Sequence, residues 1–228
     1  MKKLLSSLCL LAGSMSVQAT PVTGLINGGF EAPAYSARSY NIISEAQVPA
    51  WQTTASDGMI EIWANNFLGV KSFEGNQHAE LNANEVAALY QTTSAVKKGA
   101  ALDFKFAHRG RRGKDTVALT ITDLGLDNLY GTKDDTSIFS KQYSTGNTEW
   151  EQYTNVGGDS IWSLGNAMRF SFDSISSAGS KSYGNFLDDV NFGVHTSSVS
   201  AVPVPAAFWM FGTGLLGFIG MRKSSLKA

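Results

Sequence analysis

The chain has 228 residues, with 18 Lys and Arg against 19 Asp and Glu, and a formal net charge of −1 at pH 7. Residues 1–19 and 196–228 contain five basic and no acidic residues, so the segment between them keeps 13 basic and 19 acidic residues, a net charge of −6. An acidic domain of this kind disfavours nucleic acid as a partner, because binding to phosphates needs clustered Lys and Arg. The one basic run, residues 108–114, fits a solvated hairpin loop better than a contact to phosphate or anionic glycan.

The N-terminus has the pattern of a secretory signal peptide. Lys2 and Lys3 precede a mostly apolar stretch over residues 4–13, and Val17-Gln18-Ala19 offers a small-residue cleavage site. We expect a helical signal peptide over residues 1–19 and a mature chain that begins at Thr20. The alternative is an uncleaved anchor or a buried helix, for which the apolar stretch is short.

Removal of the signal peptide leaves no cysteine, because the single cysteine of the chain, Cys9, lies inside it. This excludes disulfides and any cysteine-based metal site or nucleophile from the mature protein. A secreted domain without disulfides has to gain its stability from its core or from a bound metal ion.

Residues 20–195 are predicted to form one all-β domain. Short runs alternate between apolar and polar residues with the period of two that is typical of half-buried strands, and Gly, Asn and Asp turns separate them. About ten such strands indicate a β-sandwich, most simply a jelly roll. The predicted strands are residues 59–63, 79–83, 87–91, 101–107, 116–122, 137–143, 168–172 and 186–194.

Two acidic motifs flank this domain and predict a structural calcium ion. The first is Asn27-Gly28-Gly29-Phe30-Glu31, and the second contains Asp188-Asp189-Val190. The first and last strands of a jelly roll commonly pair, which would bring these hard oxygen ligands together. The pair of motifs resembles galactose-binding-like carbohydrate-binding modules, and the resemblance implies Glu31 and either Asp188 or Asp189 as ligands. The alternative is a plain turn and a solvated strand edge.

A second acidic run spans residues 123–135. It resembles the D-x-G-x-D-x-x-x-G-T-x-D-D calcium loops of bacterial surface proteins, and its predicted ligands are Asp123, Asp127, Asp134 and Asp135. It differs from an EF-hand in its spacing and lacks the closing Glu. The alternative is a polar hairpin loop built from Asx turns.

Enzyme motifs are lacking, which predicts a non-catalytic protein. The three histidines, His78, His108 and His195, show no metal-binding spacing, and there is no nucleophile elbow or phosphate-binding loop. Glu61 and Glu80 are a possible carboxylate pair of the glycosidase type, but exposed strand carboxylates are far more common.

Glycan binding is the better-supported expectation, because tryptophan and tyrosine faces can stack on sugars while polar side chains bind hydroxyls. We expect Trp51, which follows a proline, and Arg109 to contact such a ligand. The alternative is that most of the aromatic residues are core residues.

The C-terminus carries the most specific pattern in the sequence. A polar linker over residues 196–202 leads into Val202-Pro203-Val204-Pro205, an apolar run over residues 206–221, and the basic pair Arg222-Lys223. As a helix the apolar run would be roughly 24 Å long, slightly short of a bilayer core. The basic pair is expected to stay on the cytoplasmic side.

This tail, residues 203–228, closely resembles the PEP-CTERM protein-sorting signal in its VPxPA form. It departs from the name-giving motif at Val204, where that motif has Glu. The resemblance implies a Gram-negative host that makes exopolysaccharide, recognition by an exosortase, and an inner-membrane intermediate with a single transmembrane helix. Cleavage would then deliver the protein to the cell envelope or the extracellular matrix. A plain single-span anchor is the alternative.

Together these observations predict an exported, sorted protein of the cell surface or biofilm matrix that binds extracellular polysaccharide, with calcium as a structural ion. A structural or adhesive matrix protein without a discrete ligand site is the alternative, and a polysaccharide hydrolase is less favoured.

Overall fold

The computed structural model describes residues 24–36 and 38–194, which belong to one compact unit, residues 20–196. The predicted signal peptide, linker and sorting tail lie outside the described residues. Within the described residues, no helix has the length and apolar character needed to cross a membrane.

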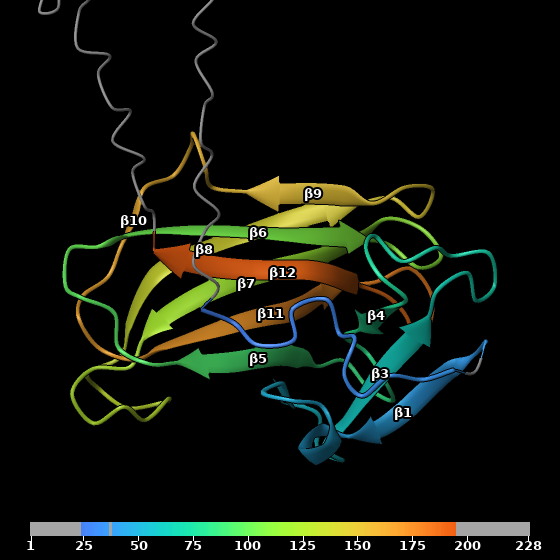
Figure 1. The fold of residues 1–228 in the computed structure, drawn as a ribbon, viewed down its shortest axis with the longest axis horizontal. Helices are drawn as coiled ribbons and strands as arrows, with labels where there is room; N and C mark the ends of the chain where they lie inside the picture. Colours follow the sequence, from blue (N-terminus) through green and yellow to red (C-terminus); the bar gives the residue numbers. More distant parts are fainter. Residues whose placement is uncertain (1–23, 37, 195–228) are drawn as a thin grey trace, which may run out of the picture. The chain divides into compact units, whose positions relative to one another are not determined.

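Twelve antiparallel strands and one short 3-10 helix, η1 (Glu45–Gln47), make up the described part of the chain (Figure 1). The strands are β1 (Tyr40–Ser44), β2 (Gln52–Thr53), β3 (Met59–Ala64), β4 (Gln77–Glu80), β5 (Ala88–Thr93), β6 (Ala101–Arg109), β7 (Asp115–Asp123), β8 (Thr136–Thr145), β9 (Glu151–Thr154), β10 (Ile161–Trp162), β11 (Met168–Ser176) and β12 (Phe186–Val194).

The strands form two sheets. Sheet A has the order β1-β3-β4-β12-β6-β10, with β9 also paired to β6, and sheet B has the order β2-β5-β11-β7-β8. Most neighbours in each sheet are distant in sequence, because the chain repeatedly crosses from one sheet to the other. The predicted all-β sandwich is confirmed.

The main core lies between the two sheets and explains the alternating sequence pattern. Phe170 and Phe172 point inward from β11, and Phe106 and Phe192 point inward from sheet A. Their rings meet across the sandwich, with centroids 5.2 Å apart for Phe106 and Phe172 and 3.8 Å for Phe170 and Phe192. Each such side chain contributes about 1.5–3 kcal/mol by its burial.

Part of sheet A is buried on its other face as well. Trp63 on β3 and Phe186 on β12 form a second apolar cluster with Val70, and Trp63 packs on Phe186 with centroids 4.8 Å apart. Val70 belongs to the loop over residues 65–76, which covers this face. The expectation of half-buried strands is therefore wrong for β4, all four residues of which are buried.

A β-bulge interrupts β12 where the start of the domain meets it. The register with β6 shifts between Asp188 and Asn191, and Asp189 has a left-handed backbone with φ of 46°. Val190 donates an N–H bond to the carbonyl oxygen of Gly28 at 3.0 Å. A Cβ at Gly28 would overlap the Val190 carbonyl oxygen, so the close approach requires glycine.

Candidate functional site

Two of the acids predicted to bind calcium lie where the start of the domain meets β12. Glu31 Oε1 accepts two backbone N–H bonds, at 2.7 and 2.9 Å, from the end of the segment 65–77. Asp188 Oδ2 accepts two more, at 2.9 and 3.1 Å, from Phe73 and Glu74. The two carboxylates thus hold the same loop, although they come from opposite ends of the domain.

Glu74 is a third acid of this cluster, and no sequence motif pointed to it. Burial raises the pKa of Glu74, and the nearby charges of Asp189 and Glu31 raise it further. Burial raises the pKa of Asp188 to about 7, and the charge of Glu74 acts in the same direction. The crowded carboxylates therefore repel one another.

The donor set of this cluster fits a hard cation. A Cβ at Gly29 would lie 2.7 Å from Glu74 Oε1, and a Cβ at Gly75 would overlap Glu31 Oε1, so the two glycines leave room for these oxygens. Carboxylate oxygens are preferred Ca²⁺ ligands. Across residues 24–36 and 38–194, however, no group of three or more His, Cys, Asp or Glu side chains is already arranged as a metal site. Calcium therefore remains a prediction.

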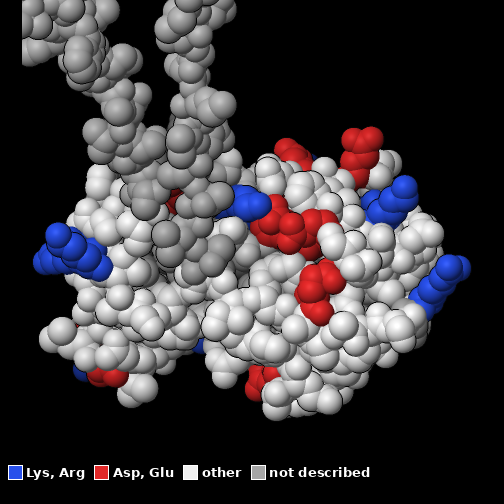
Figure 2. Space-filling view, in the orientation of Figure 1, with Lys and Arg blue, Asp and Glu red and all other residues white. Residues whose placement is uncertain are grey.

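Asp189 plays a different part from Asp188. Both of its carboxylate oxygens lie 2.7 Å from Lys105 Nζ, and Oδ2 also accepts an N–H bond from Gln152 at 2.9 Å. Lys105 thus neutralises Asp189 and leaves Asp188 as the acid of β12 that faces the cluster with Glu74. Figure 2 shows acidic side chains gathered near the middle of one face, beside a basic side chain.

The second predicted calcium loop connects β7 and β8. Its acids accept N–H bonds from their own loop: Asp127 from Leu129 at 2.9 Å, Asp134 from Leu126 at 2.8 Å, and Asp135 from Gly131 at 2.6 Å. These contacts are those of a hairpin loop built from side-chain turns. Two buried oxygens, Asp123 Oδ2 and Asp135 Oδ1, have no hydrogen-bond partner. A cation would satisfy them, so the loop also remains a predicted metal site.

Trp51 is a core residue, so the prediction that it binds a ligand is wrong. Its side chain is 1 % exposed and stacks on Phe30 with centroids 4.9 Å apart. Its indole Nε1 donates to the Asn27 carbonyl oxygen at 2.9 Å. Neither ring face can reach a sugar, because the side chain of Trp51 is enclosed in the core, although Pro49 and Ala50 before it are exposed.

Arg109 ends β6, and its side chain serves the fold. Its Nη2 donates to the Asn147 carbonyl oxygen at 2.6 Å and so anchors the loop before β9, while its Nε is buried without a partner. Burial lowers the pKa of Arg109. The hydrogen bond to Asn147 occupies Nη2, so the guanidinium of Arg109 is only partly available to a ligand.

Glu61 and Glu80 face each other on β3 and β4 and are both buried, with 3 % and 0 % of their surfaces exposed. Arg111 Nη1 lies 2.9 and 3.0 Å from the two oxygens of Glu80, and Trp63 Nε1 donates to Glu61 at 2.7 Å. Burial raises the pKa of both carboxyls, and the charge of Glu61 raises the pKa of Glu80 further, to about 9, although the charge of Arg111 acts in the opposite direction.

The pair is closed off from any substrate. The guanidinium of Arg111 is stacked between Trp63 and Tyr183, 4.7 and 4.1 Å from the two ring centroids. No glycosidic bond can enter between carboxyls that are enclosed in this way. Glu61 and Glu80 therefore form a buried structural network in this conformation.

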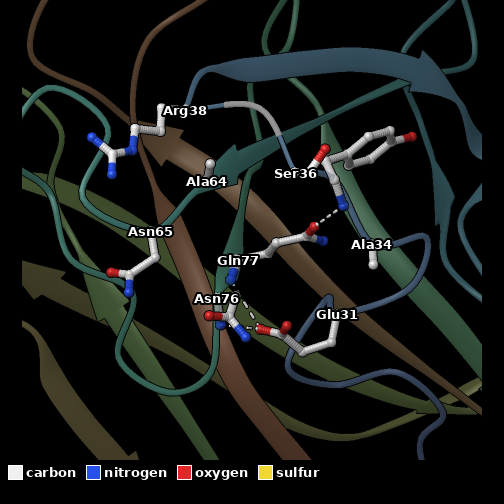
Figure 3. Close-up of a pocket in the computed structure, with 9 residues that line it drawn as sticks. Glu31, Ala34, Ser36, Arg38, Ala64, Asn65, Asn76 and Gln77 are labelled. Atoms are coloured by element: carbon white, nitrogen blue, oxygen red, sulfur yellow. Dashed lines mark hydrogen bonds between the residues drawn. The ribbon is translucent and has the colours of Figure 1, made fainter.

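A small cleft lies between the segment 31–38 and the ends of β3 and β4 (Figure 3). It has a volume of about 380 Å³ and polar walls, which include Glu31, Arg38 and Asn65. Gln77 crosses its floor, where Oε1 accepts an N–H bond from Tyr35 at 2.6 Å. The floor is thus occupied by a structural amide, and the mouth is exposed.

The outer face of sheet B combines aromatic and polar side chains, and Tyr130 from the β7–β8 loop lies over part of it. Arg169, Ser171 and Asp173 alternate on β11 with the core residues Phe170 and Phe172, so they point outward. No motif in the sequence identified them, but the alternation in residues 168–172 already separates them from the core.

Arg169 is the centre of this face. Its guanidinium carbon lies 3.5 Å from the ring centroid of Tyr90 on β5 and 3.9 Å from that of Tyr130 in the β7–β8 loop. Asp173 Oδ1 accepts a hydrogen bond from the Ser171 hydroxyl at 3.0 Å. Paired rings beside a guanidinium and a carboxylate form a surface that can stack on a sugar ring and bind its hydroxyls.

Comparison with known proteins gives structural neighbours only. No protein-family model and no curated protein sequence matches the chain. A structure described as CBM4 structure and function is 11 % identical, with a TM-score of 0.41, over 75 % of this chain and 99 % of that one.

Two further neighbours have similar values. The N-terminal cellulose-binding domain of Cellulomonas fimi β-1,4-glucanase C is 12 % identical, with a TM-score of 0.43, over 64 % of this chain and 90 % of that one. The CBM22-2 xylan-binding domain from Paenibacillus barcinonensis Xyn10C is 7 % identical, with a TM-score of 0.45, over 70 % of this chain and 100 % of that one. Identities and TM-scores this low establish no ligand for this chain.

The buried acid pair predicts how stability depends on pH. A carboxyl whose pKa is raised on folding stabilises the protein below its unfolded value and loses that contribution as pH rises through its folded value. For Glu80 the contribution is lost between the unfolded pKa of 4.5 and the folded pKa of about 9. We expect the free energy of unfolding to fall across it, with Asp188 adding a fall of the same sign up to about pH 7.

Glu61→Gln should flatten this fall, because it removes the repulsion and keeps an oxygen for Trp63 Nε1. Urea unfolding at several pH values measures the slope. Glu149→Gln, at an exposed acid, is the matched control. An unchanged slope in Glu61→Gln would show that the charge of Glu61 does not raise the pKa of Glu80.

Proposed function

We propose that residues 20–196 form a non-catalytic jelly-roll module that binds polysaccharide through the outer face of sheet B. The observation that carries the proposal is the stack of Arg169 between Tyr90 and Tyr130 on the outer face of sheet B. By contrast, the second face of sheet A is covered by its own loop, and the floor of the small cleft is occupied by Gln77.

The arrangement supports binding and not hydrolysis. The only closely opposed glutamates on neighbouring strands of the described chain, Glu61 and Glu80, are enclosed by Arg111 and Trp63. Asp173 stands on the proposed binding face as an acceptor for hydroxyl groups. The exposed ring of Tyr130, 58 % accessible, is available for stacking.

A binding experiment with residues 20–196 tests the proposal. Soluble xylan, cello-oligosaccharide, β-1,4-galactan and polygalacturonate are the probes, and calorimetry or affinity electrophoresis is the measurement. We expect saturable binding to at least one polymer and a loss of roughly three- to tenfold in Tyr90→Ala, which removes one stacking ring.

Trp162→Ala is the matched control, since Trp162 is an exposed aromatic residue (54 %) on sheet A. Loss of binding in Trp162→Ala and not in Tyr90→Ala would move the site to the other sheet. No binding to any of these polymers, and none to the exopolysaccharide of the host, would favour a structural or adhesive matrix role.

We further propose that calcium stabilises the domain at the cluster of Glu31, Glu74 and Asp188. Its support is the repulsion of Glu74 by both Glu31 and the buried Asp188, which a divalent cation would relieve. Chelation should then lower the melting temperature, since calcium at 100 times its Kd would stabilise the folded state by about 2.7 kcal/mol.

Thermal melts in calcium and in chelator measure this effect. Glu74→Gln should abolish the difference between the two buffers, whereas Asp135→Asn should preserve it unless the β7–β8 loop is the site. Glu149→Gln is again the control. Identical melts of the wild-type domain in both buffers would contradict both predicted calcium sites.

Export and sorting form the third part of the proposal and rest on the sequence of the two ends. Residues 1–19 would direct secretion, and residues 203–228 would act as a PEP-CTERM-like sorting tail cleaved by an exosortase. The ectodomain would then reach the cell envelope or the extracellular matrix beside its polysaccharide.

Mass spectrometry of the protein from a host with and without its exosortase tests this route. We expect a mature N-terminus at Thr20 in both hosts and loss of the tail only where the exosortase is present. Replacing Pro203 and Pro205 by Ala should block tail removal. A tail retained in both hosts would indicate a plain membrane anchor.

A further inference from the structure

Arg169 is a buried cation without a counter-ion. Its residue surface is only 9 % exposed, and two tyrosine rings cover the faces of its guanidinium. Removing a charge from water costs several kcal/mol unless hydrogen bonds and an opposite charge replace the water. Cation–π attraction to the rings of Tyr90 and Tyr130 offsets part of this desolvation cost.

Arg169 takes part in no ion pair of the described chain. Among residues 24–36 and 38–194, the three ion pairs involve Lys105, Arg111 and Lys141. Arg169 Nε is fully buried and has no hydrogen-bond partner in this part of the chain. Nε is therefore an unused donor at the edge of a guanidinium that lies between two rings.

Asp173 lies on the same strand face as Arg169. Its Oδ1 accepts a hydrogen bond from the Ser171 hydroxyl. Burial raises the pKa of Asp173, while the Ser171 hydrogen bond and the charge of Arg169 lower it. The two residues are four positions apart, about 13 Å along β11. An oligosaccharide chain, and not a single sugar ring, would reach both residues.

We propose that this site selects acidic polysaccharide, with the guanidinium of Arg169 binding the carboxylate of a uronic acid residue while Asp173 accepts from a hydroxyl of the same chain. A planar guanidinium matches a carboxylate through two parallel N–H bonds, which a neutral hydroxyl cannot reproduce. This inference rests on the proposed function and names the class of ligand.

The test compares one polymer in two forms: polygalacturonate, and the same polymer with its carboxyl groups reduced to alcohols. Residues 20–196 should bind the acidic form at least about tenfold more tightly, because a charged hydrogen-bonded pair exceeds a neutral one. The preference should shrink as salt rises. Arg169→Gln should remove it.

Arg112→Gln is the matched control, since it removes the same charge from an exposed arginine outside the face. Circular dichroism establishes that Arg169→Gln is folded. If it is not, Tyr130→Ala provides the second variant: it removes one covering ring from a loop and should weaken the acidic polymer more than the reduced one.

The outcomes separate this inference from the proposed function. Equal binding of the acidic and reduced polymers overturns the inference and leaves polysaccharide binding in place. A preference that Arg169→Gln retains also overturns it, because the carboxylate is then bound elsewhere. Failure of every polymer to bind overturns both. A sulfated polymer that binds as tightly as polygalacturonate would overturn the assignment to a carboxylate.

Discussion

The β-bulge in β12 is the constraint on which the rest of the domain depends. It turns the strand at Asp189, buries the carboxylate of Asp188 and lets that carboxylate hold the backbone of the loop over residues 65–76. In the same place Val190 binds Gly28, which fixes the start of the domain against its last strand. One irregularity thus orders two segments that have no strand partners of their own.

The loop held by Asp188 covers part of one face of sheet A. It lies over Trp63 and Phe186, so this part of the sheet is buried on both faces, whereas Trp162 on β10 stays exposed. In the covered part, Arg111 binds Glu80 and Trp63 binds Glu61. On the outer face of sheet B, Tyr90 and Tyr130 cover Arg169, whose Nε has no hydrogen-bond partner in the described chain.

The alternating sequence pattern predicts most of the long strands. Strands with inward-facing phenylalanines, such as β6, β11 and β12, match the sequence prediction closely, because burial of alternate residues imposes a period of two. The sequence pattern does not predict β1, β2, β9 and β10. Segments of two to four residues, such as β2, β9 and β10, contain too few alternations to detect. β1 has two adjacent isoleucines and so no clear alternation.

The candidate sites were harder to predict, because they depend on long-range contacts. Glu31 and Asp188 hold one loop, although the predicted pairing of first and last strands is wrong: β1 pairs with β3, and it is Gly24 and Gly28 that bond to β12. Glu74 joins the two acids from a segment with no motif. Trp51 follows an exposed turn, yet its own side chain is buried in the core. The alternation in β11 places Arg169 on the outer face, but its two stacking partners come from β5 and the β7–β8 loop, which no local pattern predicts.

The most direct measurement is a chemical-shift titration of isotope-labelled residues 20–196 with an acidic oligosaccharide such as tetragalacturonate. Binding at the outer face of sheet B predicts that the perturbed signals cluster at Tyr90, Arg169 and Asp173, with the Arg169 Nε–H signal among the largest shifts. Perturbations confined to the cleft at Arg38 and Asn65, or to Trp162, would contradict the account.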